Sequence, residues 1–223
     1  MKTIKTIALF LSLYFSSSAQ TVLSNIPDSG KTIAAFIPKG YDTIGIAKGD
    51  LNKDNIDDIV LALKYKDEDT FEMDEEPKRI LLVLLMSNKG LKVIGKSENV
   101  LMCRHCGGMY GDPFSAMDIT KGVLSIHHYG GSSWRWSEVR KFRMNQNGMS
   151  LIGATSDLFW SMQACNGSEI GDAGRQFRDV NFVTCDEEII ERTVECKLIK
   201  QVKQKIKRRP LVKLEDFNFE EEY

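Results

Sequence analysis

The sequence has no marked excess of either charge, because 30 lysine and arginine residues face 31 aspartate and glutamate residues, for a net charge of −1. A nucleic-acid-binding protein usually has a strongly basic balance, so we expect no nucleic-acid partner. Five cysteines in 223 residues are too few for a small, disulfide-dense scaffold. Hydrophobic residues make up 42% and charged residues 27%, which excludes wholesale disorder.

Long hydrophobic runs are also missing. The apolar run 7–15 follows Lys2 and Lys5 and precedes a short serine run that ends at Ala19. This order is typical of a secretory signal peptide, which would comprise residues 1–19. The run is too short to span a hydrocarbon core of ~30 Å, and no later stretch is long enough to do so. We therefore expect a secreted or periplasmic protein with no membrane span in the mature chain.

The remaining chain has the pattern of β-strands joined by turns. Short runs rich in Ile, Val and Leu end at polar or glycine-containing turns. These runs are 43–48, 58–64, 79–86, 91–94, 123–129 and 149–152. We expect a mainly β fold with few helices: an antiparallel meander of hairpins, similar to a propeller blade or a sandwich. Residues 20–223 would form one domain, with a weak possible boundary at 166–174, where glycine and polar residues cluster.

The region 181–207 allows two interpretations. Five apolar residues recur every four positions, as in a helix, but they also share the parity of one strand face. They are Ile190, Val194, Leu198, Val202 and Ile206. The high β-branched content favours long alternating strands.

Two segments carry charge of one sign. Residues 67–76 include seven acids, which we interpret as a solvated loop, with a second cation site as the alternative. Residues 197–209 are basic and would form an exposed strand face whose charges discourage edge pairing. A polyanion-binding patch is the alternative there.

The strongest chemical pattern lies between residues 50 and 58. Oxygen-bearing side chains occupy loop positions one, three, five and nine, and hard cations such as Ca²⁺ prefer oxygen ligands. Position six requires a sharp turn that usually needs glycine; Asn55 occupies it and tolerates positive φ better than other residues. An EF-hand would have glutamate at position twelve, where this chain has Leu61, so the loop leads into a strand.

Residues 41–95 resemble a single FG-GAP repeat of the integrin α-subunit and VCBS type. The resemblance implies a structural Ca²⁺ held between two strands. The ligands it implies are the side chains of Asp50, Asn52, Asp54 and Asp58 and the carbonyl of Ile56. The alternative is an Asx-rich turn without metal.

The second pattern is the CxxC pair of Cys103 and Cys106. Such a pair can be a redox dithiol, half of a zinc site or a small disulfide. The glycines at 107–108 disfavour the helix that would activate a redox thiol. Because we expect export, we favour a Cys103–Cys106 disulfide, with Cys185 pairing with Cys196 across a hairpin. Cys165 would then remain unpaired.

An enzyme centred on Cys103 and Cys106 is the main alternative to a binding protein. With His105 or His128, the two cysteines would form a thiol redox site or a zinc hydrolase. Only one of His127 and His128 could face such a site, since neighbouring strand residues point to opposite faces.

Two tryptophans provide the third pattern. Trp134 and Trp136 share one strand face, and Arg135 points the other way. Exposed, they could stack on sugar rings; half-buried, they would be core aromatics. The stretch 106–136 resembles exported bacterial proteins of unknown function, which implies shared architecture and no particular activity.

The leading hypothesis is an exported, non-enzymatic, calcium-binding structural or interaction module. Its partner would be an unidentified protein or glycan of the cell envelope. The alternatives are the cysteine-centred enzyme and a cell-envelope carbohydrate binder that uses Trp134 and Trp136. The sequence contains no Gly-x-Ser-x-Gly elbow, so a serine hydrolase is not favoured.

Overall fold

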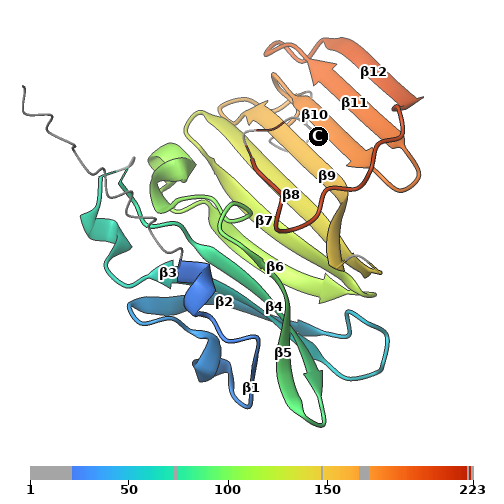
Figure 1. Cartoon of the computed structure of the whole chain (residues 1–223). Helices are drawn as coiled ribbons and strands as arrows, with labels where there is room; N and C mark the ends of the chain where they lie inside the picture. The colour runs from blue at the N-terminus through green and yellow to red at the C-terminus, as the bar shows by residue number, and fades with distance from the viewer. Residues whose placement is uncertain (1–21, 73–74, 147, 166–170, 220, 222–223) are drawn as a thin grey trace, which may run out of the picture.

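The computed structural model describes residues 22–72, 75–146, 148–165, 171–219 and 221. The expected signal peptide at 1–19 and most of the possible boundary at 166–174 lie outside these residues. The described chain is mainly β, as predicted, and consists of two antiparallel sheets (Figure 1). No helix in these ranges is long and apolar enough to cross a membrane.

The first sheet has five strands in the order β1-β5-β4-β3-β2. The strands β2 to β5 form an antiparallel meander, and the two-residue strand β1 pairs with the outer side of β5. The bounds are β1 Ser29–Gly30, β2 Tyr41–Gly49, β3 Asp58–Tyr65, β4 Ile80–Ser87 and β5 Gly90–Ser97.

The second sheet is a continuous meander of seven strands, from β6 to β12. The bounds are β6 Phe114–Thr120, β7 Val123–Gly131, β8 Trp134–Asn145, β9 Gly148–Trp160, β10 Gln176–Asn181, β11 Asp186–Arg192 and β12 Leu198–Lys205. Its last three strands extend past the first sheet (Figure 1), which is why few of their side chains are buried. Four 3₁₀ turns connect or precede strands: η1 Val22–Asn25, η2 Ile33–Phe36, η3 Glu68–Thr70 and η4 Arg104–Tyr110.

The continuous apolar runs of β3 and β4 follow from burial on both faces. One face of these strands, which includes Val60 and Val83, packs against Leu124, Ile126 and Phe142 of the second sheet. The opposite face packs under the N-terminal turns, which contribute Ile26 and Phe36. The first sheet is therefore the middle layer of the molecule.

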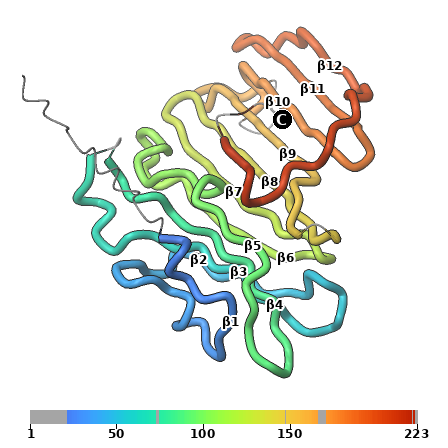
Figure 2. Tube along the Cα trace, in the orientation of Figure 1, coloured from blue at the N-terminus to red at the C-terminus, as the bar shows by residue number. Residues whose placement is uncertain are grey.

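The C-terminal segment returns from β12 to the space between the sheets (Figure 2). Leu214 and Phe217 are fully buried there, and the amide of Leu214 donates to the carbonyl of Met149. We call residues 206–219 the C-terminal strap. It places Phe219 beside the disulfide region described below.

The region 181–207 contains strands, as expected, but its regularly spaced apolar residues do not all lie on one face of the sheet. Ile189 pairs with Val202, while Ile190 pairs with Gln201. Directly paired residues lie on the same face of a sheet, so Ile190 and Val202 lie on opposite faces. The turn between β11 and β12 changes the parity, and the sequence spacing alone does not reveal this.

The basic stretch 197–209 is partly neutralised within its own sheet. Lys200 pairs with Glu191, Lys203 with Glu188 and Lys205 with Asp186, all across the β11–β12 hairpin. These pairs agree with an exposed, charged edge strand.

Candidate functional site

The Asp50–Asp58 loop connects β2 to β3 and curls tightly around one carboxylate. The carboxylate of Asp50 accepts hydrogen bonds from the backbone amides of Lys53, Asp54 and Asn55. Asn55 has φ of 66°, so the sequence correctly placed the positive φ at this position. Asn52 Oδ1 in turn accepts from the amide of Asp54.

Asp58 lies at the base of the loop and binds backbone amides there. It is fully buried, and its two carboxylate oxygens accept from the amides of Leu51 and Met86, both at 2.9 Å. Burial raises its pKa despite these hydrogen bonds. The amide of Ile56 donates to Asp54. Among the residues that the structure describes, no cluster of three or more carboxylate, thiol or imidazole groups is arranged to hold a metal.

The Cys103–Cys106 disulfide is formed, as predicted. It lies at the start of η4, with Cys103 partly buried and Cys106 exposed. Because the two sulfurs are bonded to each other, the zinc set that would include them is not formed. His127 and His128 do point to opposite sides: His127 contacts Asp118 at the surface, and His128 is buried.

The second disulfide differs from the expected one. Cys165 pairs with Cys196, and Cys185 is a buried free thiol. Cys185 precedes β11 and Cys196 follows it, so the seven-residue strand separates them by about 24 Å. The expected Cys185–Cys196 pairing was therefore wrong, since the two residues lie at opposite ends of one strand.

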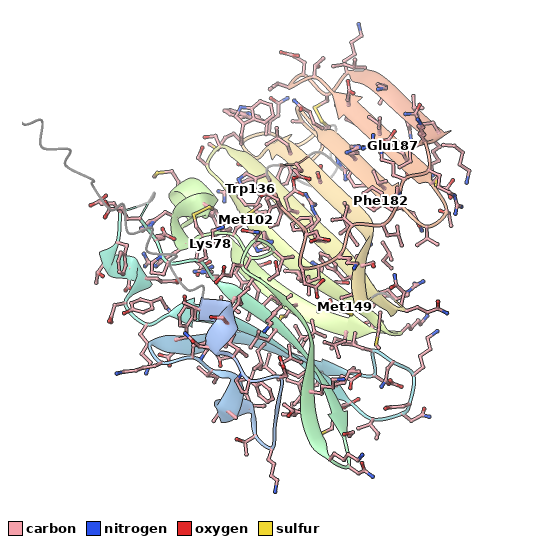
Figure 3. All side chains as sticks on the ribbon, in the orientation of Figure 1. Lys78, Met102, Trp136, Met149, Phe182 and Glu187 are labelled. Atoms are coloured by element: carbon pink, nitrogen blue, oxygen red, sulfur yellow. A yellow bond between two sulfur atoms is a disulfide. The ribbon has the colours of Figure 1, made fainter. Side chains whose placement is uncertain are left out.

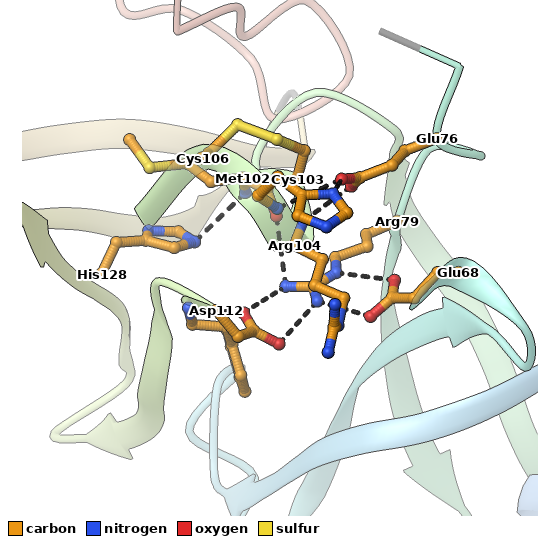
Figure 4. The surroundings of a disulfide bond; sticks show 11 residues. Glu68, Glu76, Arg79, Met102, Cys103, Arg104, Cys106, Asp112 and His128 are labelled. Carbon is orange, nitrogen blue, oxygen red and sulfur yellow. Dashed lines mark hydrogen bonds and ion pairs between the residues drawn. A yellow bond between two sulfur atoms is a disulfide. The ribbon is translucent and has the colours of Figure 1, made fainter. Parts of the chain in front are cut away.

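Beside the first disulfide lies a buried cationic centre, Arg79 (Figure 4). Its guanidinium donates two hydrogen bonds to Glu68, two to Asp112 and one to the carbonyl of Met102. Arginine has five donors, so all are satisfied. Burial alone would lower the pKa of Arg79, but the hydrogen bonds and charges of Asp112 and Glu68 outweigh it and raise that pKa. Burial likewise opposes ionisation of Asp112, yet Arg79 holds its pKa below the usual value.

Glu76 also contacts the disulfide loop (Figure 4). Its carboxylate accepts from the backbone amides of Arg104 and His105 and also contacts the His105 ring. The side chain of Glu76 is only 4% exposed, and Glu68 is 1% exposed. The interpretation of 67–76 as a solvated loop was therefore wrong for these two acids, because each is buried against a specific partner.

His128 lies beneath this region and is 1% exposed. Its Nε2 accepts from the amide of Met102 at 3.3 Å, so in the neutral ring Nδ1 carries the proton, and Nδ1 has no hydrogen-bond partner. Phe114 and Phe219 pack edge-on against the ring. Burial, reinforced by the charges of Arg140 and Arg79, lowers the pKa of His128 to about 4.

Arg79, Glu76 and the disulfide line a cleft of about 660 Å³ between the two sheets, whereas His128 lies outside its lining. The labelled residues Lys78, Met102 and Trp136 lie along it in Figure 3. Its apolar lining includes Leu101, the Cys103–Cys106 disulfide and Phe219 of the C-terminal strap. Its polar lining includes Glu76, Lys78, Glu98, Asn99, Glu138 and Asn218.

The two tryptophans of β8 have different environments. Trp136 lines the cleft and lies over Gly130, where a Cβ would come within 2.5 Å of the indole. Trp134 packs against Trp160, with ring centroids 5.4 Å apart and the ring planes tilted by 59°, and remains 37% exposed. The structure therefore brings Trp136, but not Trp134, into the cleft.

The sequence reasoning found Cys103, Cys106 and Trp136 but missed the buried partners that hold them. Arg79 directly precedes the apolar run of β4. A charge beside a buried strand needs a partner, so this position could have indicated a buried ion pair. No family model matches this chain, and no curated protein or solved structure matches it either.

Proposed function

We propose that this protein is an exported, non-catalytic binding module whose ligand occupies the cleft between the two sheets. The observation that carries the proposal is the cleft itself, in which Trp136, Met102 and a disulfide meet a few polar side chains. Its volume lies within the ~300–1,000 Å³ typical of ligand sites. The two disulfides favour an oxidising compartment, in agreement with export.

The side chains that an enzyme would use here are already engaged. The sulfurs of Cys103 and Cys106 are joined, His105 contacts Glu76, and His128 accepts a backbone hydrogen bond inside the protein. Arg79 has no donor left for a substrate. Because these side chains already bond within the protein, we favour binding over catalysis.

Protection of the disulfide tests the proposal. The Cys103–Cys106 disulfide lines the cleft, whereas the Cys165–Cys196 disulfide does not, so the second is an internal control. A ligand found in a fragment screen should slow reduction of the first disulfide by a bulky phosphine and leave the second unchanged. Ligands that shift no resonance of Trp136 or Met102, and protect neither disulfide, would refute the cleft as a binding site.

Calcium binding is a second candidate function, supported by the curl of the Asp50 loop and the positive φ of Asn55. Asp50, Asn52 and Asp54 would supply side-chain oxygens, Ile56 its carbonyl, and Asp58 would anchor the loop. A structural ion at ~100 times its Kd would stabilise the fold by about 2.7 kcal/mol.

Thermal denaturation with chelator and with excess Ca²⁺ tests this second function. Ca²⁺ should raise the Tm of the wild type and of Asp57→Asn, the matched control, because Asp57 is exposed and outside the proposed set. It should not raise the Tm of Asp50→Ala. Identical wild-type melting curves in chelator and in Ca²⁺ would contradict the proposal.

A further inference from the structure

We infer that the cleft binds a neutral oligosaccharide, with one sugar ring packed against Trp136. This inference rests on the proposed function, because it names the chemical class of ligand for the same cleft. Three observations carry it: the balance of available charge, the position of the indole, and the mixture of donors and acceptors around it.

The charged side chains that remain available to a ligand in the cleft are one acid and one base. Five charged side chains line it, namely Glu76, Lys78, Arg79, Glu98 and Glu138. The protein itself engages three: Arg79 binds Glu68 and Asp112, Glu76 binds two backbone amides, and Glu138 binds Arg140 and Ser156. Glu98 and Lys78 remain for a ligand, one of each sign. The acids outnumber the bases around the cleft, which disfavours an anionic ligand, and the two remaining groups of opposite sign can both serve a neutral polar ligand.

The indole of Trp136 is arranged as a flat platform. It lies over Gly130, whose lack of a Cβ lets the ring approach the strand, and the α-carbon of Gly107 lies against the same glycine. Backbone thus supports the ring, and Trp136 also lines the cleft. Sugar rings have apolar faces of C–H groups that pack on aromatic faces, and an already positioned ring loses little conformational entropy on binding.

The polar groups near this platform suit hydroxyl groups, which both donate and accept. Glu98 is half-buried and makes no hydrogen bond or ion pair within the described chain, so it is an available acceptor. Lys78 donates to Asn99 Oδ1 at 2.7 Å, which leaves further ammonium protons and the Asn99 amide group as donors. Such a mixed set bonds a neutral polyhydroxylated ligand better than a charged one.

The test is a binding titration with a panel of neutral oligosaccharides of the N-acetylhexosamine, glucan and mannan types. Isothermal calorimetry should find at least one ligand whose affinity changes less than twofold between low and high salt, because no charge pair is formed. Trp136→Leu should weaken that ligand about tenfold, whereas Trp136→Phe, which keeps an aromatic face, should weaken it less.

Two matched variants make the result specific. Trp134→Leu removes a tryptophan on the same strand face but outside the cleft, and it should change affinity less than twofold. Glu98→Gln keeps a hydrogen-bond acceptor and removes the charge, so a neutral sugar should lose less than threefold. Circular dichroism and quantification of both disulfides establish that each variant is folded. If Trp136→Leu does not fold, the affinities of Trp136→Phe and Glu98→Gln still test whether a neutral sugar binds on the indole.

The outcomes separate the ligand class from the proposed function. Binding of a lysine-containing tripeptide but of no panel sugar, with about tenfold loss in Glu98→Gln, would overturn the sugar inference and keep the cleft as a binding site. A sugar that binds equally well to wild type and both Trp136 variants would overturn the platform. If no sugar, tripeptide or screened fragment contacts the cleft, both the inference and the proposed function fail.

Discussion

Acid should destabilise this protein through His128. The imidazole is enclosed by Phe114 and Phe219, accepts a hydrogen bond from Met102, and faces the positive charges of Arg140 and Arg79. Asp112 is the nearby charge that acts in the opposite direction. Protonation would place an additional cation in this environment, so the folded state resists it.

The sign and size follow from the pKa in each state. The pKa of His128 is about 4 in the folded protein and 6.5 in the unfolded chain. Below pH 6.5 the unfolded chain binds the proton and the folded protein does not, so the free energy of unfolding falls as the pH falls. Between about pH 7.5 and about pH 5 the loss should be about 2 kcal/mol, and it should approach about 3 kcal/mol near pH 4.

Urea denaturation at a series of pH values measures this loss. His128→Gln keeps an acceptor for the Met102 amide but cannot titrate, so its free energy of unfolding should fall about 2 kcal/mol less than that of the wild type over the same range. His127→Gln is the matched control, because His127 lies at the surface beside Asp118. In this variant the free energy of unfolding should fall with decreasing pH as steeply as in the wild type.

Other groups titrate in acid, but the comparison of variants separates them. Asp112, whose pKa is lowered, adds a loss at lower pH, and Asp58, whose pKa is raised, acts in the opposite sense. Asp58 contributes equally to wild type and variant, and Asp112, whose charge acts on His128, titrates below the pH range compared. Parallel pH profiles for the wild type and His128→Gln would refute the reasoning, since His128 would then titrate alike in both states.

Three further predictions concern stability and can be checked by urea denaturation. Arg79→Lys should cost at least about 2 kcal/mol, because lysine has three donors where arginine uses five, and the buried carboxylate of Glu68 loses a partner; an unchanged midpoint would contradict this. Cys196→Ser should cost about 2–4 kcal/mol by breaking a crosslink over 31 residues, while Cys185→Ser, at the free thiol, should cost about 1 kcal/mol or less; equal effects would argue against the assigned pairing. Gly130→Ala should cost about 1–3 kcal/mol by displacing the indole above it, and unchanged tryptophan fluorescence would oppose that packing.

Local features of the chain were predictable because they depend on neighbouring residues. The runs 58–64 and 79–86 are continuously apolar over residues 59–63 and 80–86, and they became the doubly buried strands β3 and β4. Asn55 takes the positive φ that its position in the loop requires. Cys103 and Cys106 are three residues apart, so their disulfide closes without help from the rest of the fold.

Contacts between distant residues were not predictable, because the sequence does not say which segments meet. Arg79 is held by Glu68, 11 residues away, and by Asp112, 33 residues away, and the two come together only when η3 and the η4 loop pack beside β4. The Cys165–Cys196 pairing likewise depends on the fold, because Cys185 and Cys196 lie at opposite ends of β11 and cannot meet.

The sequence by itself determined a mainly β chain, its buried strands, one local disulfide and a curled acidic loop, because spacing and side-chain type act over a few residues. Only the tertiary structure decided that Trp136, the disulfide loop and the C-terminal strap line one cleft. It also separated Trp134 from Trp136, although the two share a strand face, because Trp160 covers one and Gly130 supports the other. The near-zero net charge of the chain could not show that the buried Glu68 and the more exposed Asp112 both pair with one buried arginine, since burial and pairing are properties of the folded molecule.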